Sequence, residues 1–408
     1  MDSIGASPAA GHRRRVLLAW ELGEGLGHAA RLLSLGERLC AAGWSAVVAA
    51  RHPAALAERY AAAGIPVVAT PPHRSCFAGP GRFRAASFAD VMGVCGFADR
   101  VQLATVVSAW DQLLDSVAPD VVIADYSPLL SLAAFGRVPL IAIGDGFVNP
   151  PGLPDGGFPP LGDTVPPLWD PAELLDNARS VAAIRGRPRP EHLHQIIAGA
   201  GQVVSVPPEL DIHAAVRPTP AAGPWQTPPP PLPPPTTPHV FAYLRSRHPV
   251  AAKVLQVLAE RRLSAECHVP DADADTLSRL ERAGIHVHLR PPPLRQALER
   301  ASFLIHHGGI GSIEDAALAG RPQLLLPRHL EQNLNVQRAM ASLRGTVTAR
   351  PDLGIGPLGA RLPQLINDDR LQRAAQAAAV RLTARPETAW GALSQQFEKI
   401  LGLPLISA

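Results

Sequence analysis

The chain has 408 residues, of which 47% are hydrophobic and 18% are charged, and its formal net charge is +3. A chain of this length usually divides into two domains, and this share of apolar residues excludes wholesale disorder. The near balance of 38 basic and 35 acidic residues excludes the strongly basic surface that nucleic-acid binding requires.

The four cysteines, Cys40, Cys76, Cys95 and Cys267, are scattered and form no C-x-x-C pair. This spacing fits free thiols in a reducing compartment better than a disulfide framework or a zinc site. The basic N-terminus is followed by the apolar run VLLAW, which is too short for a signal peptide or a membrane span. We therefore expect a soluble, cytoplasmic protein without a transmembrane segment, and a peripheral membrane contact stays open.

The first half of the chain alternates between strand-like and helix-like segments. Residues 16–20 form a short apolar run, and residues 29–42 show apolar residues at helical spacing after a glycine-rich turn. The alternation recurs with VVIADY (121–126) and LIAIG (140–144), and VVSV (203–206) is expected to be the last strand. This pattern predicts a parallel sheet covered by helices.

The segment 215–238 is rich in proline. Together with Ala214 it reads AAVRPTPAAGPWQTPPPPLPPPTTP. Proline lacks the N–H donor and fixes φ, so this segment predicts neither a helix interior nor a central strand. We expect an N-terminal domain at 1–220, an extended linker at 221–238 and a C-terminal domain at 239–385. Residues 386–408 have helical spacing and are expected to cross back to the first domain.

The second domain shows its own alternation of strands and helices, with strands expected at HVFAYL (239–244), IHVHL (285–289) and FLIHH (303–307). In the first domain, the proline-rich stretch 149–170 is too long for a plain connection. Long loops of this kind are usually lids or binding loops.

The segment richest in chemistry begins where the strand FLIHH ends at His307. The turn after this strand consists of Gly308, Gly309, Ile310, Gly311 and Ser312. We expect a helix to follow, with Glu314 and Asp315 in its first turn. Such a turn gathers backbone N–H groups at the positive end of a helix dipole, and its glycines let a phosphate approach the main chain. Ser312 adds a hydroxyl and His307 an N–H or a positive charge, which suits a diphosphate, although an ordinary serine-capped turn is the alternative.

A second glycine-rich loop runs from Trp20 to His28, between the first strand and the first helix. Ligands meet open α/β sheets at such places. The loop is not a dinucleotide-binding fingerprint, because His28 replaces the last glycine of G-x-G-x-x-G. An imidazole with a pKa near neutrality is instead suited to accept a proton from an alcohol.

These segments resemble the GT-B glycosyltransferases that use nucleotide sugars, the family of the plant UDP-glycosyltransferases and of the bacterial macrolide and glycopeptide glycosyltransferases. The residues that carry the resemblance in the second domain are His307, Gly311, Ser312, Asp315, Gly320, Pro322, Glu331, Gln332 and Asn335. The resemblance implies that His307 and Ser312 touch the diphosphate and Asp315 the ribose hydroxyls. It also implies that Glu331 and Gln332 bind the hydroxyls of the donor sugar.

The loop that ends in His28 resembles the G-x-G-H segment at the start of many GT-B enzymes, where the histidine takes the proton of the acceptor hydroxyl. The resemblance makes His28 the general base and makes Asp125, at the end of PDVVIAD, the carboxylate that orients it. A capping or packing histidine and a turn-forming aspartate are the alternatives.

The chain departs from the family pattern at two places. Residues 289–293 read LRPPP where the family often has an aromatic ring for the nucleotide base, and residues 244–247 read LRSR where it has a glycine- and serine-rich turn. Arg245 can replace the backbone N–H groups of that turn by contacting phosphate directly, because its guanidinium fork fits phosphate oxygens. An ordinary surface arginine is equally consistent with the sequence.

The sequence thus predicts an α/β protein with two Rossmann-like domains that face a cleft. The predicted function is that of an inverting, metal-independent glycosyltransferase. It would move a hexose from a UDP- or dTDP-sugar to a hydroxyl of a small, apolar acceptor, such as a natural product, a phenolic or a lipid. The loop 149–170 would lie on the acceptor side.

We expect no cofactor besides the nucleotide-sugar co-substrate. No metal site is expected either, because the H-x-H pairs at 192–194 and 286–288 lack carboxylate or cysteine partners at ligand spacing. Two alternatives stay open. One is a nucleotide-sugar epimerase or hydrolase of the same fold, which would release nucleotide without an acceptor. The other is a non-catalytic protein that binds a sugar nucleotide.

Overall fold

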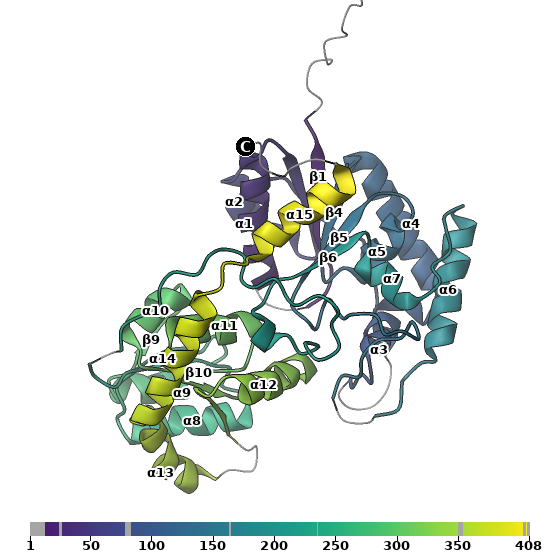
Figure 1. Ribbon diagram of the computed structural model, residues 1–408. Coiled ribbons are helices and arrows are strands. Elements are labelled where there is room, and N and C mark those ends of the chain that lie inside the picture. The colour runs from purple at the N-terminus through teal and green to yellow at the C-terminus, as the bar shows by residue number, and fades with distance from the viewer. Residues whose placement is uncertain are drawn as a thin grey trace, which may run out of the picture. The chain divides into compact units, whose positions relative to one another are not determined.

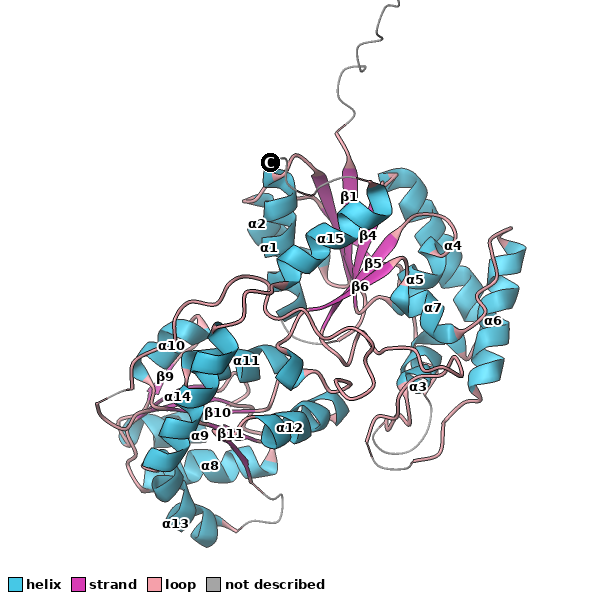
Figure 2. Ribbon diagram, in the orientation of Figure 1, coloured by secondary structure: helices cyan, strands magenta, loops and turns pink. Residues whose placement is uncertain are grey.

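The computed structural model describes residues 13–23, 27–77, 83–162, 165–234, 236–349, 354–402 and 405. The chain folds as two compact units, which can be followed by colour in Figure 1. The N-terminal unit comprises Met1–Gly144, Val148–Val203 and Gly391–Ala408, and the C-terminal unit comprises Asp145–Phe147 and Val204–Trp390. Figure 2 shows that each unit has a core of strands flanked by helices.

The N-terminal unit contains a six-stranded sheet with the order β3-β2-β1-β4-β5-β6. The strands are β1 (Arg15–Trp20), β2 (Ser45–Ala50), β3 (Val67–Ala69), β4 (Val121–Asp125), β5 (Leu140–Gly144) and β6 (Gly201–Val204). Strands β1 to β5 pair in parallel, and β4 and β5 are buried along their whole length. Burial on both faces explains why these strands read as continuous apolar runs.

Helices and short turns connect these strands. They are α1 (Gly27–Ala41), η1 (Pro53–Ala55), α2 (Ala57–Ala61), α3 (Phe88–Met92), η2 (Gly93–Phe97), α4 (Arg100–Val117), α5 (Pro128–Ala134), α6 (Pro171–Ile184) and α7 (Leu193–Ala198). Helix α4 begins at the cap Asp99, whose carboxylate accepts the N–H groups of Val101 and Gln102. It ends at Ala118, which adopts a left-handed conformation.

The C-terminal unit contains a second six-stranded sheet, with the order β12-β11-β10-β7-β8-β9 and parallel pairing throughout. Its strands are β7 (Val240–Tyr243), β8 (Ala265–His268), β9 (His286–Val287), β10 (Phe303–His306), β11 (Gln323–Leu325) and β12 (Thr346–Thr348). Its helices are α8 (Pro249–Glu260), α9 (Ala274–Arg282), α10 (Leu294–Arg300), α11 (Ile310–Ala319), α12 (Leu330–Ser342), α13 (Ile355–Ile366) and α14 (Asp369–Thr383), and the turn η3 (Pro208–Leu210) precedes β7.

The last helix, α15 (Ala389–Leu401), returns to the N-terminal unit, as the sequence predicts. Phe397 is fully buried and meets the ring of Trp44 edge-on at a centroid distance of 5.2 Å. Gln396 lies so close to Gly201 that a Cβ there would be 2.4 Å from its Oε1 atom. A glycine in β6 therefore makes room for this helix.

The division between the units lies earlier in the chain than the sequence pattern indicates. Residues 204–220 pack with the C-terminal unit, because Val206, Leu210 and Ala221 are buried in a cluster with residues of α11 and α12. The described residues of the proline-rich segment 221–238 form no helix or strand, and they belong to the C-terminal unit. The backbone N–H of Leu232 bonds to the carbonyl of Ala319, and its side chain packs against the buried cluster that includes Phe241. The expected last strand, 203–206, is shifted to Gly201–Val204.

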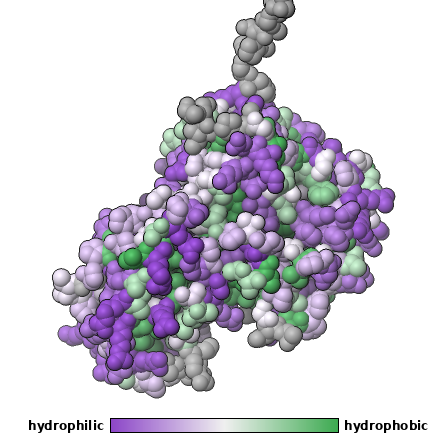
Figure 3. All heavy atoms as spheres, in the orientation of Figure 1, coloured by the Kyte–Doolittle hydropathy of each residue, from purple (hydrophilic) through white to green (hydrophobic). Residues whose placement is uncertain are grey.

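On the face shown in Figure 3, hydrophilic and hydrophobic residues are interspersed over both units. No single helix in the described part of the chain is long and apolar enough to span a membrane. Two consecutive helical segments, Phe88–Phe97 and Arg100–Val117, are together long and apolar enough, but the chain bends by 80° between them.

Candidate active site

The first candidate site lies in the N-terminal unit, where β1 and β4 end side by side. Trp20, the last residue of β1, pairs with Asp125, the last residue of β4. Because parallel strands end at one edge of the sheet, the loops that follow them meet there. Helix α1 starts after the first of these loops and carries His28 in its first turn.

His28 and Asp125 are in direct contact, as the sequence predicts. His28 Nδ1 lies 2.9 Å from Asp125 Oδ1, and the Asp125 side chain is completely buried. The carboxylate accepts, so Nδ1 carries a proton, and a neutral imidazole in this tautomer has its basic nitrogen at Nε2. The indole of Trp20 stacks on the imidazole at 5.3 Å, and the Tyr126 ring lies 6.2 Å away. The arrangement orients a proton acceptor.

Arg31 is a functional candidate that the sequence analysis missed. Its Nη1 atom donates to the second oxygen of Asp125 at 2.9 Å. Burial alone would raise the pKa of Asp125, but Arg31 and His28 together hold that pKa below its usual value. The signal was present in the sequence, since residues three apart on a helix share a face. Their shared partner Asp125 lies on β4, and only the fold shows that it is close to both residues.

Glu21 is a second missed residue and fixes the ends of the two strands. One carboxylate oxygen accepts the indole N–H of Trp110, and the other accepts the backbone N–H groups of Leu129 and Leu130 at the start of α5. The backbone N–H of Glu21 donates to Ser127 Oγ. Burial raises the pKa of Glu21 to about 7. This carboxylate is bonded to Trp110 and to the start of α5, and it holds the loops together.

Tyr126, directly after Asp125, has a φ of 54°, which few residues other than glycine adopt. Its carbonyl oxygen accepts the N–H of Leu22 at 3.1 Å, which joins the two loops. Gly23 has a φ of 90°, and a Cβ there would be 3.0 Å from His28 Nε2. The backbone of this loop therefore lies directly against the imidazole.

The second candidate site lies in the C-terminal unit, after β10. The helix that follows starts earlier than the sequence predicts. Helix α11 begins at Ile310, directly after Gly309, so Gly311 and Ser312 lie in its first turn and Glu314 and Asp315 in its second. Glycine is a weaker N-cap signal than the acidic residues further on, which explains the error.

The glycines of this loop differ in whether backbone conformation and packing require glycine at their positions. Gly308 has a φ of 79°, and a Cβ there would be 2.7 Å from Val336, so fold and packing both demand glycine. Gly309 and Gly311 have no such need, because a Cβ at either would meet nothing within 4 Å. Glycine at these two positions leaves the backbone N–H groups of the helix start open to a ligand.

His307 is a neutral imidazole whose two nitrogens both have partners. Nδ1 donates to the carbonyl oxygen of Leu326 at 2.7 Å, and Nε2 accepts the backbone N–H of Arg245 at 2.7 Å. Burial lowers the pKa of His307 to about 4. Both ring nitrogens of His307 are thus engaged within the protein in this structure, and its contact with a phosphate stays a prediction. The histidine ties together the ends of β7, β10 and β11.

Arg245 lies in the loop after β7, and its side chain is exposed. The next two backbone N–H groups, of Ser246 and Arg247, donate to the carboxylate of Asp271 at 2.7 and 3.2 Å. Partial burial raises the pKa of Asp271, but these bonds bring it below its usual value. A carboxylate of the chain itself thus occupies the N–H groups that a glycine- and serine-rich turn would present. Ser246, Arg247 and Asp271 line a pocket of about 600 Å³.

The other predicted donor residues lie on two neighbouring helices. Ser312 is half-buried, and Asp315 is exposed one turn later on α11. Glu331 and Gln332 are half-buried in the first turn of α12, and Gln332 Oε1 accepts the N–H of Arg328 at 2.9 Å. Gly308 packs on α12, since a Cβ there would be 3.5 Å from the Gln332 carbonyl oxygen.

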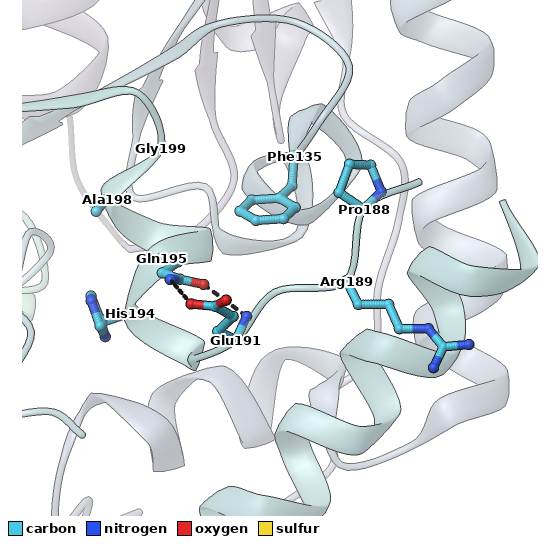
Figure 4. A pocket seen from close by; sticks show the side chains of 8 residues that line it. All are labelled: Phe135, Pro188, Arg189, Glu191, His194, Gln195, Ala198 and Gly199. Atoms are coloured by element: carbon cyan, nitrogen blue, oxygen red, sulfur yellow. Dashed lines mark hydrogen bonds between the residues drawn. The ribbon is translucent and has the colours of Figure 1, made fainter. Parts of the chain in front are cut away.

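None of the predicted site residues lines the pocket in Figure 4, an open hollow of about 450 Å³ in the N-terminal unit. Glu191 and Gln195 face each other there and share two hydrogen bonds. Within the described ranges, no three His, Cys, Asp or Glu side chains are arranged to hold a metal ion.

Residues 262–391 match the family described as erythromycin biosynthesis protein CIII-like, C-terminal domain. This segment contains the glycine loop, Asp315, Glu331 and Gln332. No protein of curated function matches the chain by sequence.

Solved structures resemble the chain over nearly its whole length. The glycosyltransferase VinC in complex with dTDP superposes with a TM-score of 0.67 at 18% identity, over 94% of this chain and 98% of VinC. The glycosyltransferase of kitacinnamycin gives 0.66 at 17% identity, over 95% and 100%. The spinosyn forosaminyltransferase SpnP gives 0.64 at 17%, over 96% and 100%. These similarities confirm the predicted α/β fold with two Rossmann-like domains, which is that of GT-B glycosyltransferases.

Proposed function

We propose that this chain, a GT-B-fold protein with an erythromycin biosynthesis protein CIII-like domain at residues 262–391, transfers a sugar from a nucleotide diphosphate to a hydroxyl of a small acceptor. The observation that carries the proposal is the contact between His28 and the buried Asp125. A base oriented by a carboxylate is what the activation of an alcohol requires.

In the proposed reaction, His28 Nε2 takes the proton of the acceptor hydroxyl while the oxygen attacks the anomeric carbon of the sugar. The bond from that carbon to the diphosphate oxygen breaks, and the nucleotide diphosphate leaves with the electron pair. Asp125 stabilises the imidazolium that forms. One displacement of this kind inverts the anomeric centre.

The start of α11 is the proposed place for the leaving diphosphate. Its open N–H groups and its dipole stabilise negative charge without a metal ion. Gly309 and Gly311 allow close approach, and Ser312 adds a hydroxyl. For His307 Nε2 to contact the diphosphate directly, the bond from the Arg245 N–H must first open.

For the remaining donor contacts, we propose that Asp315 binds the ribose and that Glu331 and Gln332 bind the sugar hydroxyls. Gln332 keeps its amide nitrogen for this purpose while its oxygen accepts the Arg328 N–H. Arg245, whose side chain is exposed and whose backbone N–H bonds to His307, is a further candidate for phosphate contact.

The proposed nucleotide is dTDP or UDP, since the similar structure of VinC was solved with dTDP. The proposed acceptor is an apolar natural product, phenolic or lipid, because the similar structures include enzymes of kitacinnamycin and spinosyn. The four free thiols are consistent with a reducing, cytoplasmic location.

The proposal is tested first by calorimetry with dTDP, UDP, GDP and ADP, and then by turnover of the matching sugar nucleotide with and without a panel of apolar alcohols. We expect dTDP or UDP to bind, and the nucleotide to be released only when an acceptor is present. Release without any acceptor would favour the epimerase or hydrolase. Binding without turnover, unaffected by His28→Ala, would favour the non-catalytic protein.

A further inference from the structure

The Asp125 carboxylate has a basic group on each of its oxygens. His28 Nδ1 lies at Oδ1 and Arg31 Nη1 at Oδ2, both at 2.9 Å. Both basic side chains come from α1, three residues apart, and 17% of each is exposed, whereas Asp125 is fully buried. The carboxylate therefore carries one negative charge between two groups that can each be positive.

This balance decides the protonation state of His28. A buried carboxylate with a histidine as its one basic partner favours the imidazolium, because the ion pair as a whole is then neutral. An imidazolium has no lone pair and cannot accept a proton from an alcohol. The positive charge of Arg31 on the same carboxylate opposes a second positive charge on His28, which a partly buried position also disfavours.

We propose that Arg31 is a positioning residue of this site, which fixes the Asp125 carboxylate and balances its charge so that His28 stays neutral and able to accept a proton. The catalytic consequence rests on the proposed function. The effect of the Arg31 charge on His28 rests on the contacts that both side chains make with Asp125.

Other titratable groups come from the neighbouring strand ends. Asp145 directly follows β5, is buried, and accepts the N–H of Phe147. Tyr126 follows β4, and its ring lies 6.2 Å from the imidazole. Glu21 follows β1, but its carboxylate is directed to Trp110 and to the start of α5. Asp125 touches His28 directly, and Arg31 acts through Asp125.

The test is an NMR titration of His28 in the free protein, with histidine labelled at Cε1. The chain has 15 histidines, so the His28 signal is assigned by its loss in His28→Gln. Arg31→Gln keeps an N–H donor for Asp125 but removes the charge, and we expect it to raise the pKa of His28 by about one unit or more. Arg31→Lys keeps the charge and is expected to leave that pKa close to the wild-type value.

Arg59→Met is the matched control, because Arg59 is an exposed arginine on α2 of the same unit. If Arg31→Gln does not fold, Arg31→Met takes its place. An unchanged His28 pKa in a folded, uncharged variant would overturn the proposal, and so would an equal rise in Arg31→Lys, because charge would then not be the cause.

A transferase assay separates this inference from the proposed function. In Arg31→Gln, we expect the acid limb of the kcat/KM profile to move to higher pH by the same amount as the NMR titration. A shifted titration with an unshifted rate profile would remove His28 as the base and leave the charge balance standing. An inactive wild type would refute the transferase and still allow the titration to decide on Arg31.

Discussion

Two histidines stand at comparable places in the two units, and their surroundings give them different properties. His28 and His307 each lie between the end of a parallel strand and the body of the following helix. His28 Nδ1 donates to a carboxylate, whereas His307 Nδ1 donates to a carbonyl oxygen and its Nε2 accepts a backbone N–H. The first can take up a proton during a reaction, and the second is committed to holding three strand ends together. The partners, rather than the residue type or the place in the fold, decide the role.

Replacing His28 gives the largest expected effect on rate. We expect His28→Ala to lower kcat by about 10²–10⁴-fold, because a general base is lost. Its free energy of unfolding should change little, since the side chain is partly exposed and Asp125 keeps Arg31 as a partner. Steady-state kinetics and urea unfolding measure the two quantities. A stability loss with kcat unchanged would reverse the roles that we assign to the two histidines.

Replacing His307 should have the opposite pattern. His307→Ala leaves the Leu326 carbonyl and the Arg245 N–H without their buried partner, and we expect the free energy of unfolding to fall by about 2–4 kcal/mol. Calorimetry with dTDP should show weaker binding as the loop after β7 loosens. Stability equal to wild type would mean that the three strand ends do not depend on this imidazole.

The same histidine predicts a dependence of stability on pH. Its pKa is about 4 in the folded chain and 6.5 when unfolded, so the unfolded state binds more protons between these values. The contribution of His307 is full above pH 6.5 and is lost as pH falls towards 4, at a cost on the order of 1–2 kcal/mol at pH 5. Unfolding of the wild type and of His307→Gln at pH 7 and pH 5 measures it. The difference between the two proteins should shrink at pH 5.

The smallest effect concerns Gly311, one of the two loop glycines that neither fold nor packing requires. A methyl group at Gly311 meets nothing and suits a helix, so we expect Gly311→Ala to stabilise the chain by about 0.5–1 kcal/mol. It should weaken dTDP binding by roughly tenfold if a phosphate approaches there. Gly356→Ala is the matched control, because Gly356 is likewise the second residue of its helix and has open space. Equal nucleotide affinity in both variants would argue against a phosphate at Gly311.

The sequence predicted the type of fold, because strands buried on both faces and glycine-rich turns leave local signals, and the roles that it assigns to the site residues stay predictions. It did not predict which unit the apolar residues Val206 and Leu210 would join. Hydrophobicity requires burial but does not specify the partner. Arg31 was missed for a related reason. His28 is close to Arg31 in the sequence, and their proximity on α1 can be predicted. Asp125 is 94 residues from Arg31, and the pairing of β1 with β4 brings it close.

His307 shows a different limit of sequence reasoning. The motif places His307 beside the glycine loop. Its neutral state follows from two backbone groups, the carbonyl of Leu326 directly after β11 and the N–H of Arg245 after β7. Neither group has a signature in the sequence, since every residue except proline has both. Protonation states of buried histidines are set by such contacts.

The return of α15 to the N-terminal unit affects how the chain is made. Phe397 completes the packing around Trp44, yet the ribosome adds it only after the whole C-terminal unit. Part of the apolar surface of the N-terminal unit therefore stays uncovered during synthesis until α15 has been made. Domains that emerge first usually fold first, and an incomplete one is exposed to aggregation and to chaperones for the time that the remaining residues take to be translated.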